Sequence, residues 1–177
     1  PHKIQFFYPS FTRSFKNHET ILEAIKVIPK NIAEKTQFHF TTIKDSKEKY
    51  AQFLVKEYRF LENVRFYGKV KRNQLLSMYN AMDCLIFPSK VETWGLPISE
   101  AKAYKKPMIL ADLPYAKEAC GNYEKVSFFD ENNAVALAKV ITEFVEENHN
   151  FQGNTLAFDT SKDLHNWKEL FHYILNN

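Results

Sequence analysis

The sequence is short of glycine and of cysteine. Only four glycines occur among its 177 residues, so it has no glycine-rich phosphate loop, and this shortage disfavours a dinucleotide site or a P-loop. The two cysteines, Cys84 and Cys120, lack the spacing of metal ligands. Two lone thiols of this kind are typical of a reduced, cytoplasmic protein.

The sequence also lacks a strong charge bias and a long apolar run. Its net charge of +3 is small and evenly spread, which argues against a nucleic-acid partner. No apolar run approaches the length that spans a bilayer. The first residue is not Met, and no signal-peptide pattern follows it. Because 45% of the residues are apolar, we expect one folded domain over residues 1–177, cut from a longer chain.

Predicted strands and helices alternate along the whole chain. Short apolar or alternating runs predict strands at residues 3–8, 37–43, 63–67, 83–87, 107–111 and 125–129. Helical periodicity predicts helices at residues 17–28, 46–61, 72–82, 115–120, 133–147 and 163–175, and another that opens at Pro97. This order predicts an α/β fold: a Rossmann-like three-layer domain with a parallel sheet of about six strands.

The most informative stretch runs from Pro88 to Ala103 and reads PSKVETWGLPISEAKA. It joins a predicted buried strand to a predicted helix. In open α/β sheets such a loop lies at the carboxyl ends of the strands, where ligands bind. Gly95 lets the backbone approach a ligand closely, and the free N–H groups of a helix N-terminus favour an anion.

Two glutamates flank this phosphate-friendly backbone. Glu92 stands on the loop and Glu100 lies one turn into the helix, with seven residues between them. Carboxylates on both sides of such a backbone suit a ligand with phosphates in the middle and hydroxyls at both ends. A nucleotide-sugar fits this description.

The same stretch resembles the donor-site motif of retaining glycosyltransferases of the GT-B fold, specifically their large fourth family. That motif reads P-S-x-x-E-[GTS]-[FW]-G-L-P-x-x-E-A, and it is matched here at Pro88, Ser89, Glu92, Trp94, Gly95, Leu96, Pro97, Glu100 and Ala101. The resemblance covers nearly the whole chain. It implies the carboxyl-terminal, nucleotide-sugar-binding half of a GT-B enzyme, without the amino-terminal acceptor domain.

The resemblance implies a role for each motif residue. Glu92 would contact hydroxyls of the donor sugar and serve as the catalytic residue, while Glu100 would bind the two ribose hydroxyls. The amides of Gly95 and Leu96 would face the diphosphate. The donor-binding loop as a whole then comprises Glu92, Thr93, Trp94, Gly95 and Leu96.

The segment YPSFTRSFKNHETILEA, which begins at Tyr8, is similar to the family's YP…R…KN…EA segment. The resemblance implies that Arg13 and Lys16 clamp the diphosphate, and a forked guanidinium and an ammonium both suit phosphate oxygens. One departure is that Pro9 and Ser10 occupy the place where many members carry Gly-Arg. The alternative for both cations is a solvated polar loop.

A turn made of Gly68, Lys69 and Val70 follows another predicted strand. In the family, the matching G-x-V turn lends backbone groups to the nucleobase, so the resemblance places these three residues at the donor site. An ordinary turn between a strand and a helix fits the sequence equally well.

The function implied is retaining transfer of a hexosyl group from a UDP- or GDP-sugar to a glycan or lipid-linked acceptor, as in polysaccharide biosynthesis. Arg13, Lys16 and the helix N-terminus would stabilise the charge of the departing diphosphate. GT-B enzymes generally use no metal or other cofactor, and the sequence contains no Asp-x-Asp. We expect a cytoplasmic location, or a peripheral one at the inner face of the membrane in the full-length enzyme, and no activity without the amino-terminal domain.

Other functions are compatible with parts of the sequence. A nucleotide-sugar epimerase or a phosphorylase-like enzyme uses a similar GT-B half-site, and a Rossmann-like domain with a vestigial site is a further alternative. A signalling receiver needs an acidic cluster with a phospho-acceptor Asp where a strand ends. Asp83 instead begins its strand, and no predicted strand range ends in Asp, so we set the receiver aside.

Overall fold

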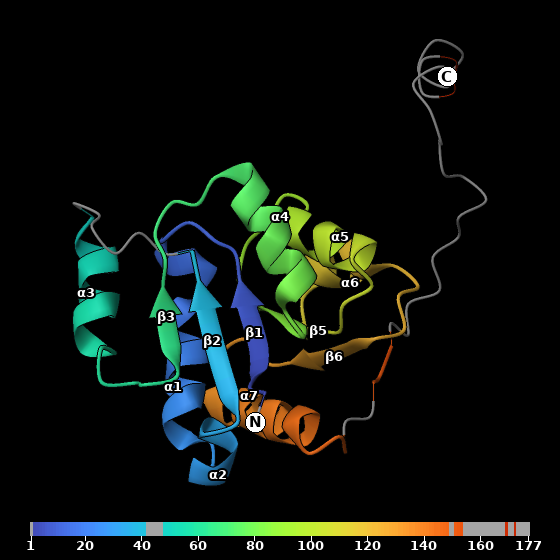
Figure 1. Cartoon of the computed structure of the whole chain (residues 1–177). Coiled ribbons are helices and arrows are strands. Elements are labelled where there is room, and N and C mark those ends of the chain that lie inside the picture. The colour runs from blue at the N-terminus through green and yellow to red at the C-terminus, as the bar shows by residue number, and fades with distance from the viewer. Residues whose placement is uncertain (1, 42–47, 149–150, 154–168, 170–171, 173–177) are drawn as a thin grey trace.

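The computed structural model describes residues 2–41, 48–148, 151–153, 169 and 172 (Figure 1). They form six strands flanked by helices, and the N-terminus leads directly into β1, an inner strand of the sheet. The predicted helix at residues 163–175 lies outside the described residues except for two positions. Among the helices of the described residues, none is long and apolar enough to cross a membrane.

The six strands form one parallel sheet in the order β3-β2-β1-β4-β5-β6, which confirms the predicted sheet. Phe6 of β1 pairs with Phe38 of β2 on one side and Cys84 of β4 on the other. The strands β4 and β5 are buried along their whole length, as expected when helices cover both faces. The bounds are Ile4–Tyr8 for β1, Thr36–Phe40 for β2, Val64–Phe66 for β3, Cys84–Phe87 for β4, Met108–Ala111 for β5 and Val126–Phe129 for β6.

Helices cover the sheet in two layers (Figure 1). One layer contains α1, which packs against α7, and α3, whose Tyr50 and Tyr58 donate hydrogen bonds to Glu19 and Glu23 of α1. The other layer contains α4, α5 and α6, with Tyr79 of α4 against Phe7 of β1. The bounds are His18–Val27 for α1, Lys30–Ala33 for α2, Lys49–Glu57 for α3, Arg72–Ala81 for α4, Leu96–Ala103 for α5, Pro114–Cys120 for α6 and Ala134–Val145 for α7.

The strand order places a topological switch point between β1 and β4. The chain runs outward from β1 through β2 to β3, then returns through α4 to β4 on the other side of β1. The connections on the two sides of the switch point therefore lie on opposite faces, and in open α/β sheets ligands bind at the carboxyl ends of the strands beside such a point. This position is where the sequence predicts the ligand.

Several predicted boundaries differ from the structure. The helix predicted to reach residue 61 ends at Glu57, because the chain turns there with Leu61 bonded to Tyr58 before β3 begins. The strand predicted to reach residue 43 ends at Phe40. The short helix α2 and the 3₁₀ turn η1, Ser14–Lys16, carry no periodicity long enough to predict them.

The strand order also replaces one argument made from the sequence. Asp112 and Asp130 do follow β5 and β6 directly, so the absence of Asp at strand ends was too narrow a reason to reject a receiver. Receivers have the strand order 2-1-3-4-5, whereas the order here is 3-2-1-4-5-6. The topology therefore excludes that fold.

Candidate functional site

The carboxyl edge of the sheet brings together the loops that follow β1, β3, β4 and β6. The backbone N–H of Lys90, in the loop after β4, donates to the carbonyl of Phe15 in the loop after β1, over 2.8 Å. Two loops that are more than seventy residues apart in the sequence thus share a backbone hydrogen bond at the predicted site. Parallel strands with right-handed connections produce this convergence.

Lys16 and Glu92 form an ion pair across these two loops. The Lys16 Nζ lies 2.5 Å from the Glu92 Oε1, and only 16% and 12% of the two side chains is exposed. The Tyr8 hydroxyl donates to the backbone carbonyl of Lys16 over 2.5 Å, which fixes the backbone that carries this cation. The structure therefore places the predicted phosphate-binding cation directly beside the predicted sugar-binding carboxylate.

Asn17 connects three of the loops. Its backbone adopts the left-handed conformation with φ 59°, and its side-chain amide donates to the carbonyls of Pro88, at 3.1 Å, and Glu131, at 2.7 Å. Asn tolerates this conformation better than most residues, which is the only local signal for such a role. The sequence alone did not single out Asn17, because its partners come from the far loops.

Hydrogen bonds from Ser89 and from Tyr115 of α6 hold the loop after β4 in place. The Ser89 hydroxyl donates to the carbonyl of Val91 over 3.1 Å, and the Tyr115 hydroxyl of α6 donates to the carbonyl of Ser89 over 2.5 Å. Gly95 precedes α5 with φ +83°, and a Cβ there would lie 3.2 Å from the Cδ1 of Ile98. The positive φ therefore favours glycine at this point, and a Cβ would also require the end of the Ile98 side chain to shift slightly.

The remaining residues of the predicted donor-binding loop face solvent. Thr93, Trp94 and Leu96 are exposed, and the Trp94 indole N–H donates to the Ser99 hydroxyl over 3.1 Å. The helix α5 begins at Leu96 rather than at Pro97, with Pro97 in its first turn as expected. The N-terminus of α5 therefore lies at the same edge as the pair of Lys16 and Glu92. Within it, Pro97 has no N–H, and the Ile98 N–H donates to the Gly95 carbonyl over 2.9 Å.

Glu100 lies one turn into α5, and its side chain is 20% exposed. The Arg72 Nη1, at the start of α4, lies 2.6 Å from the Glu100 Oε1. The structure thus adds to the predicted ribose-binding carboxylate a cation that the sequence did not suggest. The available signal was position alone, since Arg72 follows the Gly68 turn at the same edge of the sheet.

Arg13 does not join the ion pair of Lys16 and Glu92. Its guanidinium pairs with the Glu48 carboxylate just before α3 and also donates to the carbonyl of Thr12. About half of the Arg13 side chain is exposed. Of the two predicted phosphate-clamp residues, the structure therefore places Lys16 beside Glu92 and turns Arg13 toward the outer end of the loop.

The turn at Gly68 leads from β3 to α4. Gly68 is buried with φ +84°, Lys69 is exposed and Val70 is half-buried. The Tyr67 N–H donates to the carbonyl of Phe40, over 2.9 Å, which holds the turn against the end of β2. The positive φ explains the glycine, and the turn lies at the edge where the sequence predicts the nucleobase.

His18 lies directly behind the site. Its ring is fully buried against Tyr8 and Phe40, and both ring nitrogens lack a hydrogen-bond partner in the part of the chain that the structure describes. Burial, and then the neighbouring Lys16 ammonium, lower the pKa of His18 to about 3. The histidine is therefore neutral at physiological pH, and an uncharged, buried ring lies next to Lys16.

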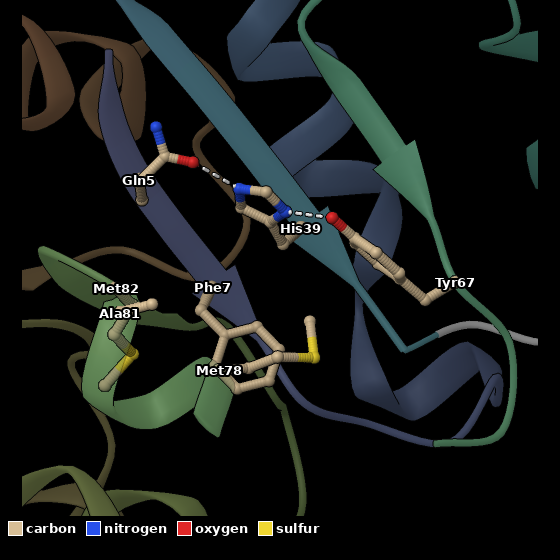
Figure 2. A pocket seen from close by; sticks show the side chains of 7 residues that line it. All are labelled: Gln5, Phe7, His39, Tyr67, Met78, Ala81 and Met82. Atoms are coloured by element: carbon tan, nitrogen blue, oxygen red, sulfur yellow. Dashed lines mark hydrogen bonds between the residues drawn. The ribbon is translucent and has the colours of Figure 1, made fainter. Parts of the chain in front are cut away.

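A hollow of about 160 Å³ lies on the sheet face beside α4 and is lined by none of the predicted donor residues, although its Tyr67 directly precedes Gly68 (Figure 2). Within it, the Nε2 of His39 lies 2.6 Å from the Oε1 of Gln5, and its Nδ1 lies 2.8 Å from the Tyr67 hydroxyl. The amide oxygen only accepts, so Nε2 carries the hydrogen and Nδ1 accepts from Tyr67. The hollow is lined by Gln5, Phe7, His39, Tyr67, Met78, Ala81 and Met82.

Possible metal ligands do not gather in the described residues: no group of three or more His, Cys, Asp or Glu side chains is found there. The site residues instead consist of one mostly buried ion pair, one partly exposed ion pair and the N-terminus of a helix. Such a set suits a ligand that carries both anionic and hydroxyl groups.

The fold and this edge together define a Rossmann-like domain of the GT-B glycosyltransferase type. The chain belongs to the family described as glycosyl transferases group 1, which matches residues 2–157. The resemblance inferred from the motif is thereby confirmed for the family and the fold.

Two curated relatives illustrate this membership. An uncharacterized 41.2 kDa protein in the cps region of Klebsiella pneumoniae is 30% identical over 138 residues, which cover 76% of this chain and 36% of that protein. The O-antigen chain mannosyltransferase RfbU of Salmonella typhimurium is 32% identical over 71 residues, which cover 40% of this chain and 20% of that protein. The match thus spans about a third or less of each relative.

Solved structures share the fold at low sequence identity. The sucrose-phosphate synthase of Thermosynechococcus elongatus superposes with a TM-score of 0.71 and 22% identity, over 99% of this chain and 45% of that one. The Anabaena protein Alr3699/HepE in complex with UDP superposes with a TM-score of 0.68 and 18% identity, over 84% of this chain and 40% of that one. These likenesses establish the GT-B half-fold.

Proposed function

We propose that this chain is the donor-binding half of a retaining hexosyltransferase, which takes a UDP- or GDP-hexose and serves a glycan or lipid-linked acceptor. The observation that carries the proposal is the ion pair of Lys16 and Glu92 at the carboxyl edge of the sheet, beside the N-terminus of α5. One cation, one carboxylate and the N-terminus of a helix match a diphosphate that is joined to a sugar.

In this proposal the diphosphate leaves as the bond to the anomeric carbon breaks. The Lys16 ammonium and the N-terminus of α5 stabilise its growing negative charge, with Arg13 at the outer end of the same loop. Glu92 accepts hydrogen bonds from the hydroxyls of the sugar and orients it. Thr93 and Trp94 complete the donor-binding loop. The turn of Gly68, Lys69 and Val70 contributes backbone hydrogen-bonding groups to the nucleobase. No metal or other cofactor takes part.

The comparisons support a hexosyl donor. The names of two matched curated proteins are those of mannosyltransferases, WbdA of Escherichia coli and RfbU of Salmonella typhimurium. Solved structures with the same fold contain UDP or UDP-glucose. Since the match covers about a third of its relatives or less, we assign the acceptor site to a second, amino-terminal domain. We also assign a cytoplasmic or peripheral inner-membrane location and a part in polysaccharide synthesis.

Calorimetric titration of the protein with UDP, GDP and ADP tests the donor site. We expect one nucleotide to bind, and Glu100→Ala to weaken it by about 1.5–3 kcal/mol, the range for hydrogen bonds to a charged group. Glu118→Ala, on α6, is the matched control and should leave the affinity unchanged. Unchanged affinity in Glu100→Ala would remove Glu100 from the ribose site. Binding of none of the three would indicate either a site that the amino-terminal domain completes or a vestigial site, and the same titration of the full-length protein decides between these two.

A transfer assay on the full-length protein separates the proposal from the related enzymes. A nucleotide-sugar epimerase releases an altered sugar without an acceptor, and a phosphorylase requires inorganic phosphate. We expect instead a glycosylated acceptor with the anomeric configuration of the donor. A product of inverted configuration would contradict the retaining assignment.

A further inference from the structure

Arg72 meets Glu100 at the point where α4 and α5 open onto the carboxyl edge of the sheet. The distance between Arg72 Nη1 and Glu100 Oε1 is 2.6 Å. The guanidinium side chain is 67% exposed, whereas the carboxylate side chain is 20% exposed. A largely exposed cation therefore pairs with a carboxylate side chain that is mostly shielded from solvent.

The fold itself gives little reason for Arg72. Exposed ion pairs contribute little to stability, because solvent screens them and two long side chains lose their freedom. Arg72 is also the first residue of α4, where the helix dipole opposes a positive charge. Its position is thus explained by Glu100 rather than by the helix that carries it.

Tyr79 lies on the same face of α4 as Arg72, because the two residues are seven apart. It is fully buried, stacked on Tyr104 and edge-on to Phe7, and its hydroxyl makes no hydrogen bond within the described residues. Burial, followed by the neighbouring Glu100 carboxylate, raises the pKa of this hydroxyl. On this face of α4, Arg72 is the side chain that pairs with Glu100.

We propose that Arg72 is a positioning residue that holds the Glu100 carboxylate toward the ribose and makes the donor site select a nucleotide with both ribose hydroxyls. This inference rests on the proposed function, in which Glu100 binds those hydroxyls. It adds the residue that holds the Glu100 carboxylate in one orientation.

The chemistry follows from the acceptor capacity of a carboxylate. An ionised carboxylate has about four lone-pair sites on its two oxygens and no donor of its own. Arg72 occupies one site on Oε1, which leaves sites for the two O–H groups of a vicinal diol. A site built in this way rejects a ligand that lacks one hydroxyl, because an oriented, partly buried acceptor then has no partner.

The test is calorimetric titration of the protein with UDP and GDP beside their 2′-deoxy forms, in wild type, Arg72→Ala and Arg72→Lys. In wild type we expect the ribose form of one nucleotide to bind more tightly. Arg72→Ala should weaken that form by about tenfold, the upper cost of leaving one long side chain unfixed, and should affect the 2′-deoxy form much less. Arg72→Lys should restore part of the preference, since it keeps the charge.

Two further variants sharpen the result. Arg65→Ala removes an exposed arginine of β3 that donates to the backbone carbonyls of Glu62 and Val64, and it should leave both affinities unchanged. In a Glu100→Gln background, Arg72→Ala should cause no additional loss. Thermal unfolding of each variant shows that it is folded.

Three outcomes would overturn the inference. An equal loss for the ribose and deoxy forms in Arg72→Ala would mean that Arg72 acts on the nucleotide's charge, and unchanged affinities would remove it from the site. A wild type that binds the nucleotide without preferring ribose would contradict the role of Glu100. A wild type that binds neither nucleotide even in the full-length protein would refute the proposed function itself.

Discussion

The Lys16 ammonium lies 2.5 Å from the Glu92 carboxylate, and more than four fifths of each side chain is shielded from solvent. The pair joins the loop after β1 to the loop after β4, so it links the two sides of the switch point. Removing one partner of such a pair leaves an uncompensated, mostly buried charge, which costs more than the pair contributes.

We therefore predict that Lys16→Ala lowers the free energy of unfolding by about 3 kcal/mol. Replacing both partners, in Lys16→Met with Glu92→Gln, should recover most of the loss, because no unpaired charge remains. Urea denaturation measures both effects. Lys26→Ala, from the exposed pair with Glu23, is the matched control and should cost about 1 kcal/mol or less. Additive losses in the double variant would show that the two groups are not coupled.

Asn17 offers a test of how the loops are held. Asn17→Gly keeps the left-handed backbone but loses the bonds to Pro88 and Glu131, and should destabilise by about 2 kcal/mol. Asn17→Ala should destabilise by about 1 kcal/mol more, because a Cβ disfavours the left-handed conformation. Denaturation in urea compares the two. If neither variant changes the free energy of unfolding, the Asn17 amide does not hold the loops together.

Glu92 is expected to distinguish the sugar from the nucleotide. Glu92→Gln should leave binding of free UDP or GDP nearly unchanged, because the proposed phosphate contacts remain. It should reduce the extra affinity for the sugar-bearing form by about 1.5–3 kcal/mol, the range for hydrogen bonds to a charged group. Titrations with UDP against UDP-glucose, and GDP against GDP-mannose, measure the difference. If both forms weaken equally, Glu92 does not contact the sugar.

His18 should make stability depend on pH. Its pKa in the folded state, about 3, lies below the ordinary value of 6.5, so the unfolded chain binds more protons between these values. The free energy of unfolding should therefore fall as the pH drops below about 6.5, by about 2 kcal/mol at pH 5 from this residue alone. Above pH 7 the contribution is constant.

Urea denaturation of wild type and His18→Phe at pH 5 and pH 8 measures this effect. The variant should lose most of the difference between the two pH values, because an apolar ring takes up no proton. His18→Leu provides a second apolar replacement of smaller size. A wild-type slope retained in both variants would place the pH dependence elsewhere.

The six strands, their parallel arrangement and the loop that carries the motif could all be predicted from the sequence. Strands such as Cys84–Phe87 are continuous apolar runs, and helices such as Ala134–Val145 repeat their apolar residues every three or four positions. The local residue pattern therefore predicts which residues are buried. The convergence of Lys16, Glu92 and Glu100 on one edge also follows from the sequence, because parallel strands with right-handed connections all end there.

Which side chains form ion pairs with one another could be seen only in the three-dimensional structure. Lys16 and Glu92 lie 76 residues apart in the sequence, and Arg72 and Glu100 lie 28 apart. Arg13, three residues from Lys16, turns instead to Glu48. Such pairings depend on the strand order and on the direction in which each loop leaves its strand, and neither is encoded in the periodicity of a single element. The sequence therefore names the chemical groups at the site, and the packing of the loops selects their contacts.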